Sequence, residues 1–199
     1  GFSEASSTPR RLPAGPLGDT GRVDPIRRVA SREVYRNDWM VVREDEIHRP
    51  DGTRGVYGVI DKPTYALVIA RDGERFRLVE QFRYPLDRVF LEFPAGKLDP
   101  GESPLETDRR ELVEEAGFTA RTWTPLGVIH PVISYSTERI ELWLAEGLEH
   151  VGSKLDPGEF LEIVALTEDE LLAAWDRGEV TDAKTVAALF AWRRRRGLG

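Results

Sequence analysis

Residues 96–118 read GKLDPGESPLETDRRELVEEAGF, and the rest of the chain is organised around this stretch. Its second half predicts an amphipathic helix, because Leu105, Leu112, Val113 and Ala116 can share one apolar side that docks on a core. The sequence therefore places one well-defined helix near the middle of the chain, with acidic residues on its other side.

The boundaries of this helix are marked by capping residues. Ser103 followed three residues later by Glu106 forms a capping box, and Pro104 occupies the first helical position. Gly117 stands where a left-handed residue ends a helix. We therefore expect the helix to begin after Ser103 and to end just before Gly117.

Three carboxylates crowd one stripe of this helix. Glu111 and Glu115 lie one turn apart on the same face, and Glu114 flanks Glu111. Like charges at this spacing repel each other by a few tenths of a kcal/mol. A hard divalent cation would turn this repulsion into binding energy, because such ions prefer oxygen ligands. A solvated acidic helix face is the alternative.

The spacing of the constrained residues resembles the signature of the Nudix hydrolases. Gly96 is followed after five residues by Glu102, and after seven more by Arg110-Glu111-Leu112-x-Glu114-Glu115-x-Gly117-Phe118. Every defined position of the signature is matched, which favours a metal site over a solvated face. The chain departs from its relatives just before the Arg-Glu pair, where small residues are common and this sequence has Thr107, Asp108 and Arg109.

Residues outside the signature resemble one branch of this family, the ADP-ribose pyrophosphatases, which hydrolyse nucleoside diphosphate sugars. The resemblance is carried by Gln81-Phe82-Arg83-Tyr84 and by Glu92-Phe93-Pro94-Ala95-Gly96. It implies an α/β Nudix fold in which helices sandwich a mixed β-sheet. It also implies an N-terminal antiparallel β extension that is exchanged between the subunits of a homodimer.

The resemblance implies a metal site on the helix. Glu111, Glu115, the backbone carbonyl of Ala95 and Glu114 would hold two or three Mg²⁺ or Mn²⁺ ions. Arg110 would orient a glutamate, although an ordinary surface ion pair is the alternative. Glu102 would help to hold the loop and its carboxylates.

A general base must take a proton from the attacking water, and in this branch a loop before a late strand supplies it. Residues 154–162 occupy that place, with the sequence Lys-Leu-Asp-Pro-Gly-Glu-Phe-Leu-Glu. We expect Glu159 to be the base, with Glu162 as the second choice. Both could instead be surface charges at a strand edge.

The resemblance also suggests residues that bind substrate. Arg83 is expected to bind phosphates or ribose, since a guanidinium matches phosphate geometry. Glu92 could be an outer metal ligand or a ribose contact, and either residue could be part of a structural ion pair. Tyr35 and Trp39 stand where relatives stack an adenine, although a core position is a common role for a tryptophan.

The loop of residues 130–138 sets substrate choice in the family, and Glu138 is its candidate contact. ADP-ribose enzymes often have Ser-Pro-Gly in this loop, where this chain has Val132, Ile133 and Ser134. The substrate could therefore be another compound: a UDP- or GDP-sugar, a dinucleoside polyphosphate or NADH. A sensor that binds ADP-ribose without cleaving it is disfavoured, because the signature carboxylates are all retained.

Composition limits the remaining classes. The chain has 199 residues, a net charge of −7 and no cysteine. The acidic balance argues against nucleic-acid binding, and the absence of cysteine excludes disulfides and thiolate catalysis. No apolar run has the length of a membrane span, so we expect a cytoplasmic enzyme without a membrane partner.

Patterning along the chain predicts three parts. Residues 1–24 predict a flexible arm, residues 25–62 a β segment for dimerisation and base binding, and residues 63–199 the Nudix domain. Strands are expected through this last part, with a strand over residues 138–145 among them, and two helices close it at 167–177 and 181–195. The expected reaction is metal-dependent cleavage of ADP-ribose to AMP and ribose 5-phosphate.

Overall fold

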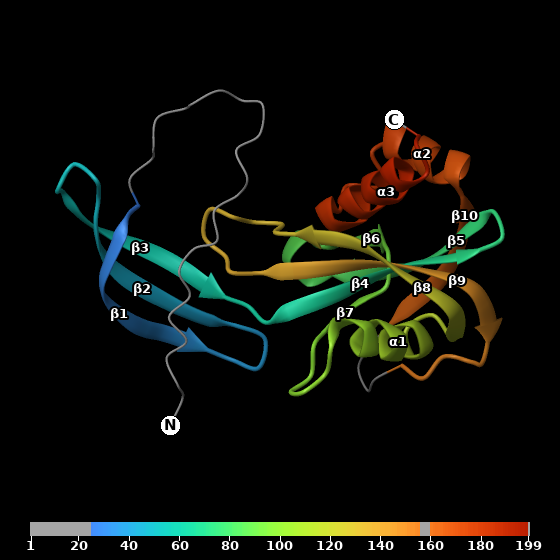
Figure 1. Cartoon of the computed structure of the whole chain (residues 1–199), viewed down its shortest axis with the longest axis horizontal. Helices are drawn as coiled ribbons and strands as arrows, with labels where there is room; N and C mark the ends of the chain where they lie inside the picture. The colour runs from blue at the N-terminus through green and yellow to red at the C-terminus, as the bar shows by residue number, and fades with distance from the viewer. Residues whose placement is uncertain (1–24, 156–159, 199) are drawn as a thin grey trace.

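The computed structural model describes residues 25–155 and 160–198, which form two β-sheets and three α-helices (Figure 1). The arm expected at residues 1–24 lies outside the described residues, and so does Glu159, the expected base. The two sheets lie at opposite ends of the elongated molecule, and all three helices pack on the larger sheet.

The larger sheet has seven strands and is mixed, as the sequence predicts. Five strands follow the order β10-β5-β4-β9-β8, and β6 and β7 pair with β5 and β4. The pairing of β4 with β9 is parallel and the other pairings are antiparallel. The strands are β4 (Thr64–Asp72), β5 (Arg75–Arg83), β6 (Arg88–Glu92), β7 (Ala95–Lys97), β8 (Phe118–Ile129), β9 (Arg139–His150) and β10 (Leu161–Thr167).

Helices cover both faces of this sheet. One face carries α1 (Pro104–Glu114), and the other carries α2 (Glu168–Asp176) and α3 (Ala183–Arg195) (Figure 1). A single 3₁₀ turn, η1 (Tyr84–Leu86), joins β5 to β6. Within the described part of the chain, no helix is long and apolar enough to cross a membrane.

Strand β4 is the centre of the hydrophobic core, because its apolar residues alternate between the two faces. Leu67 and Ile69 pack with the core under α2 and α3, whereas Val68 and Ala70 pack with the core under α1. All four are fully buried. This two-sided burial is why the strand reads as a continuous apolar run in the sequence.

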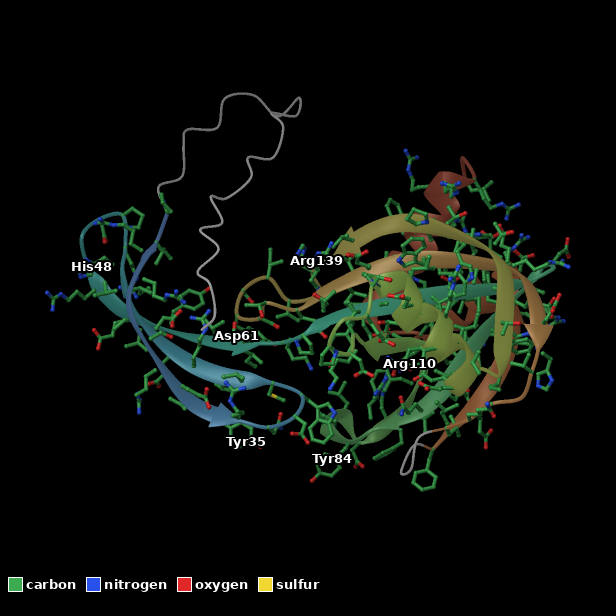
Figure 2. All side chains as sticks on the ribbon, turned by 60° about the horizontal axis from the view of Figure 1, so that its bottom comes forward. Tyr35, His48, Asp61, Tyr84, Arg110 and Arg139 are labelled. Carbon is green, nitrogen blue, oxygen red and sulfur yellow. The ribbon has the colours of Figure 1, made fainter. Side chains whose placement is uncertain are left out.

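The smaller, N-terminal sheet is antiparallel and has the order β1-β2-β3. Its strands are β1 (Arg27–Arg36), β2 (Val41–His48) and β3 (Arg54–Asp61). All ten residues of β1 are exposed. Asp61, at the end of β3, lies at the junction of the two sheets (Figure 2).

The loop before β9 ties the two sheets together. The backbone N–H of Ile60 donates to the carbonyl of Tyr135 at 2.7 Å, and Thr137 N–H donates to the carbonyl of Ile60 at 3.0 Å. This is the loop that the sequence links to substrate choice. The N-terminal sheet is therefore attached to the main domain through that loop.

The boundaries of α1, α3 and β9 can be compared with those that the sequence predicts. The capping box at Ser103 and Glu106 forms as predicted, and Gly117 has the left-handed φ of 73°. Asp182, expected inside the last helix, instead precedes it and accepts a hydrogen bond from Thr185 N–H at 2.9 Å. Strand β9 continues beyond residue 145, to His150, because it stays paired with β8 over its whole length.

Asp108 is a buried carboxyl on the core side of α1. It is fully buried, and neither of its carboxylate oxygens has a hydrogen-bond partner among the described residues. Burial raises the pKa of Asp108 well above its ordinary value, and the nearby charges of Glu111 and Glu141 raise it further. Asp108 therefore keeps its proton in the folded protein at pH values where it is ionised in the unfolded chain.

This buried acid should make the protein less stable as the pH rises above the unfolded pKa of about 3.9, because the folded state then binds more protons than the unfolded state. Asp108→Ala should raise the free energy of unfolding at pH 8 by about 1–3 kcal/mol, the usual cost of a buried unpaired polar group. The gain should shrink as the pH falls towards 4. Chemical denaturation in EDTA measures it, with exposed Asp38→Ala as the control. An Asp108→Ala variant that is less stable than the wild type at pH 8 would contradict this reading.

Candidate active site

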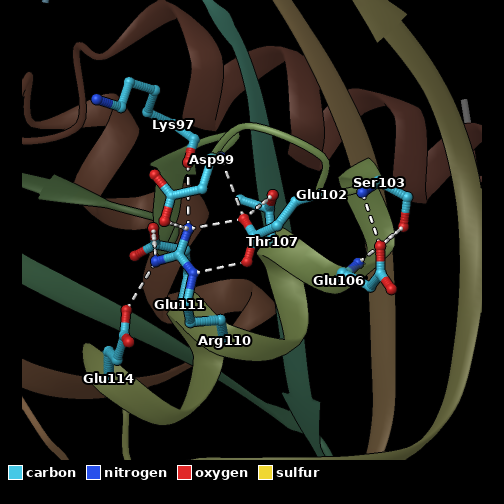
Figure 3. Close-up of polar contacts among 9 residues, drawn as sticks. All are labelled: Lys97, Asp99, Glu102, Ser103, Glu106, Thr107, Arg110, Glu111 and Glu114. Carbon is cyan, nitrogen blue, oxygen red and sulfur yellow. Dashed lines mark hydrogen bonds and ion pairs between the residues drawn. The ribbon is translucent and has the colours of Figure 1, made fainter.

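Arg110 is the centre of a polar network between α1 and the loop that precedes it (Figure 3). Its Nη1 donates to Oε1 of Glu111 and to Oε2 of Glu114, both at 2.8 Å. Its Nε and Nη2 donate to the two oxygens of Glu102, each at 3.1 Å, and Nη2 also donates to the carbonyl of Lys97. The hydrogen bonds to Glu102, followed by those to the helix glutamates, raise the pKa of Arg110. One guanidinium thus fixes three carboxylates.

Glu102 anchors the loop from the other side. Besides Arg110, it accepts hydrogen bonds from the hydroxyl of Thr107 at 2.8 Å and from the N–H of Asp99 at 3.2 Å. The Arg110 hydrogen bonds, with these two donors, lower the pKa of Glu102 to about 2. Glu102 is therefore ionised at neutral pH, and it holds the loop against the start of α1.

Two helix glutamates pack against the backbone of β7. The N–H of Ala95 donates to Oε2 of Glu115 at 3.1 Å. A Cβ on Gly96 would lie 1.6 Å from Oε1 of Glu111, so only glycine lets this carboxylate approach the strand. Glu111 is 9% exposed and Glu115 is 6% exposed. Gly96 is therefore required by close packing and has no side chain that could take part in chemistry.

This arrangement fits a hard divalent cation. Carboxylate oxygens of Glu111 and Glu115 approach the Ala95–Gly96 backbone, and carboxylate and carbonyl oxygens are the ligands that Mg²⁺ prefers. Among residues 25–155 and 160–198, no group of three acidic or histidine side chains forms a ready-made metal cluster. Glu114 in particular binds Arg110 in this structure. The donor set is thus suitable for Mg²⁺, which usually binds one or two carboxylates and completes its coordination with water and substrate oxygens.

A polar pocket of about 370 Å³ opens beside these carboxylates. It brings together residues from both sheets and from α1. Its walls are formed by Trp39, Tyr65, Gln81, Arg83, Ala95, Gly96, Lys97, Asp99, Arg110, Glu111 and Glu115. Trp39, from the β1–β2 turn of the N-terminal sheet, is 59% exposed, so it is not a core tryptophan. The lining thus combines three carboxylates, three cationic side chains and two aromatic rings, which suits a ligand with phosphates and a base.

Arg83 and Glu92 form a bidentate ion pair at the pocket wall. Nε and Nη2 of Arg83 donate to the two oxygens of Glu92 at 2.6 and 2.8 Å. Burial opposes the charge of Glu92, but the hydrogen bonds and charges of Arg83 and Lys184 outweigh it and lower its pKa. Glu92 is only 3% exposed, whereas Arg83 reaches the pocket. Arg83 can therefore contact a ligand, while Glu92 keeps the guanidinium of Arg83 in place.

Besides Glu92, Glu102 and Glu162, three further expected site residues do not line this pocket. Tyr35 lies on β1, where its hydroxyl accepts a hydrogen bond from Asn37 at 3.4 Å (Figure 2). Glu138 is half-buried just before β9, and its N–H donates to the hydroxyl of Ser136. Glu114 is held by Arg110 on the flank of α1. The sequence predicts that these three residues belong to the site, but none of them lines the pocket in this structure.

Glu162, the second choice for the general base, lies on the face of the main sheet opposite to the one that carries Gln81 and Arg83. In β10 it shares a face with Val164 and Leu166, which pack on the core under α2 and α3. Gln81 and Arg83, which line the pocket, point to the other face, since Leu161 and not Glu162 pairs with Gln81. The structure therefore separates Glu162 from the carboxylates of α1.

Lys184, on the first turn of α3, is a neighbour of the site that no sequence pattern predicts. Its Nζ donates to Oε2 of Glu92 at 3.0 Å, behind the pocket wall. The two residues are 92 positions apart, and no spacing or motif joins them in the sequence. Only the folded sheet, with α3 across its end, brings them together.

Comparison with known families and proteins identifies the class. A family model described as "NUDIX domain" matches residues 61–189, and one described as "Nucleoside diphosphate sugar hydrolase N-terminal domain" matches residues 26–60. The first match covers more than half of the chain. The chain therefore belongs to the Nudix family of hydrolases.

Individual relatives agree with this assignment. The chain is 32% identical over 166 residues to an ADP-ribose pyrophosphatase of Bacillus subtilis, covering 82% of this chain and 90% of that protein. It is 30% identical over 172 residues to a methanol dehydrogenase activator of Bacillus methanolicus, covering 85% and 93%. A crystal structure of an ADP compounds hydrolase aligns with a TM-score of 0.80 at 23% identity, over 90% of this chain and all of that one. The last likeness shows the shared fold.

Proposed function

We propose that this Nudix hydrolase cleaves the pyrophosphate bond of ADP-ribose or a related nucleoside diphosphate sugar, with AMP and ribose 5-phosphate as the products from ADP-ribose. The observation that carries the proposal is the pocket in which Glu111 and Glu115 meet Arg83 and Trp39. The names of the Bacillus subtilis relative and of the N-terminal family model support this substrate class.

We infer that Glu111, Glu115 and the carbonyl of Ala95, with Glu114, hold two or three Mg²⁺ or Mn²⁺ ions. Bound divalent metal would neutralise the charge of the pyrophosphate and lower the pKa of a water molecule. The chain's own contribution is positioning, which is a major part of phosphoryl-transfer catalysis. Arg110 keeps Glu111 and Glu114 in place, and Arg83, which lines the same pocket, would bind the phosphates.

We further propose that Glu159 is the general base that takes the proton of the attacking water. Described residues on both sides of it support this choice. Before it, Lys154 N–H donates to the carbonyl of Glu114 at the end of α1 at 3.1 Å. After it, Leu161 pairs with Gln81, which lines the pocket. Lys154, before Glu159, and Leu161, after it, thus both contact residues that lie at or next to the pocket.

Glu159→Gln and Glu162→Gln form a matched pair that tests this assignment. Loss of a general base should lower kcat for ADP-ribose by about 10²- to 10⁴-fold in Glu159→Gln. Glu162→Gln should keep nearly full activity, because residue 162 lies on the opposite face of the sheet. Steady-state kinetics with Mg²⁺ measures both variants. A larger loss in Glu162→Gln than in Glu159→Gln would reverse the assignment.

Residues 25–62 are proposed to exchange between two subunits of a homodimer and, through Trp39 and Tyr35, to bind the base, while residues 63–199 carry the chemistry. The exposed apolar side chains of the N-terminal sheet support an interface there: Val29, Val34 and Val56 are 57%, 44% and 64% exposed. Contiguous exposed apolar side chains of this kind mark protein–protein interaction sites.

The homodimer predicts a mass in solution of twice the 22.5 kDa of one chain. Val56→Glu should shift the protein towards monomer, because a charge would be buried in the interface. Light scattering after size exclusion measures the mass, and Val128→Glu on exposed β8 is the control. A wild-type protein that is monomeric at micromolar concentration would rule out the exchanged dimer.

A substrate panel tests the proposed function itself. ADP-ribose, UDP- and GDP-sugars, a dinucleoside polyphosphate and NADH are incubated with the protein and Mg²⁺, and the released phosphomonoesters are measured with a phosphatase. ADP-ribose or another ADP-sugar should give the highest kcat/KM, and EDTA should abolish turnover. A higher kcat/KM for another compound would contradict the proposed substrate. Binding of ADP-ribose without turnover at any metal would indicate a sensor.

A further inference from the structure

The first turn of α3 is hydrogen-bonded to the short segment that joins β6 to β7. The hydroxyl of Thr185, which is fully buried, accepts a hydrogen bond from the N–H of Phe93 at 3.2 Å. Asp182 caps the same helix by accepting from Thr185 N–H and from its hydroxyl at 2.9 and 2.8 Å. The start of α3 is thus attached to the backbone just after Glu92.

Four charged groups meet at this contact. Lys184 Nζ lies 3.0 Å from Oε2 of Glu92 and 3.7 Å from Oδ1 of Asp182. Glu92 in turn binds Arg83 through both oxygens. Two cations therefore balance two carboxylates, and the side chain of Glu92, at 4% exposure, is almost completely removed from water.

The charge balance of this cluster affects ligand binding through Arg83, because Arg83 is the member of the cluster that lines the pocket. Glu92 engages Nε and Nη2 of the guanidinium, so the Nη1 edge is left for a ligand. If Lys184 lost its charge, two carboxylates would act on one arginine, and the cluster would change from neutral to a net charge of −1. A negative cluster at this wall would repel a diphosphate. Glu92 would also lose the contact that fixes its Oε2 from the side of α3, so that Arg83 would be positioned less precisely.

We propose that Lys184 is a positioning residue of the active site, which fixes Glu92 from behind so that Arg83 presents its open edge to the phosphates of a nucleoside diphosphate. This inference rests on the proposed function for its substrate class. Lys184 does not line the pocket, so it acts through Glu92 and Arg83 and not by contact with the ligand.

The test compares Lys184→Met with Lys184→Arg and with Arg177→Met. Arg177 forms an exposed bidentate pair with Glu179 in the loop before α3, so its loss removes a cation from the same region without touching the cluster. Two measurements are made: the Kd of ADP-ribose in EDTA by calorimetry, and KM and kcat with Mg²⁺. Thermal unfolding of each variant checks the fold, and Lys184→Gln serves as a second neutral variant.

Lys184→Met should raise Kd and KM about fivefold to tenfold, as expected for the loss of one charge close to a polyanion site. Its kcat should stay within about twofold of the wild type, because positioning for binding is lost and not the chemistry. Lys184→Arg should restore most of the affinity, and Arg177→Met should match the wild type. In a Glu92→Gln background, Lys184→Met should have a smaller effect, because residue 92 then needs no counter-ion.

Several outcomes would overturn the inference. Unchanged Kd and KM in Lys184→Met, equal losses in Lys184→Arg and Lys184→Met, or additive effects with Glu92→Gln would each show that Lys184 does not act through Glu92. Binding of ADP-ribose without turnover in the wild type would refute the proposed function only, since the Kd ratios would still decide the role of Lys184. A wild type that does not bind ADP-ribose would refute both.

Discussion

The binding of three carboxylates by the guanidinium of Arg110 is the interaction on which the rest of the site depends. Glu111 and Glu114 would repel each other on one helix stripe, and the hydrogen bonds of Arg110 offset that repulsion. The third carboxylate, Glu102, ties the preceding loop to the helix through the same group. The loop that precedes α1 is thus fixed next to the acidic face of the helix.

The main sheet places this network beside the other residues that line the pocket. Strand β4 is buried on both faces, so α1 packs on one side and α2 and α3 on the other. Its partner β7 brings Ala95 and Gly96 under Glu115 and Glu111. Strand β5 supplies Arg83 to the same pocket, and Lys184 of α3 binds Glu92, the ion-pair partner of Arg83. Residues of helices on opposite faces of one sheet are therefore connected to the same pocket.

Much of the site could be predicted from the sequence, because its signals are local. The helix cap at Ser103, the stripe of glutamates and the glycine next to Glu111 all lie within 23 residues. Pairing between distant segments could not be predicted in the same way. Glu162 alternates with apolar residues in β10, but the face it occupies depends on its register with β5. Lys184 reaches Glu92 only because α3 crosses the end of the sheet.

We infer that the acidic face of α1 is a metal-dependent catalytic site, and the turnover of ADP-ribose by Glu115→Gln with Mg²⁺ is the decisive measurement. We expect kcat/KM to fall by roughly two orders of magnitude or more while the unfolding temperature stays close to that of the wild type. Glu74→Gln, which alters an exposed residue of the β4–β5 turn, should retain wild-type activity. Near-normal turnover in a folded Glu115→Gln variant would show that this face of α1 is not the catalytic site.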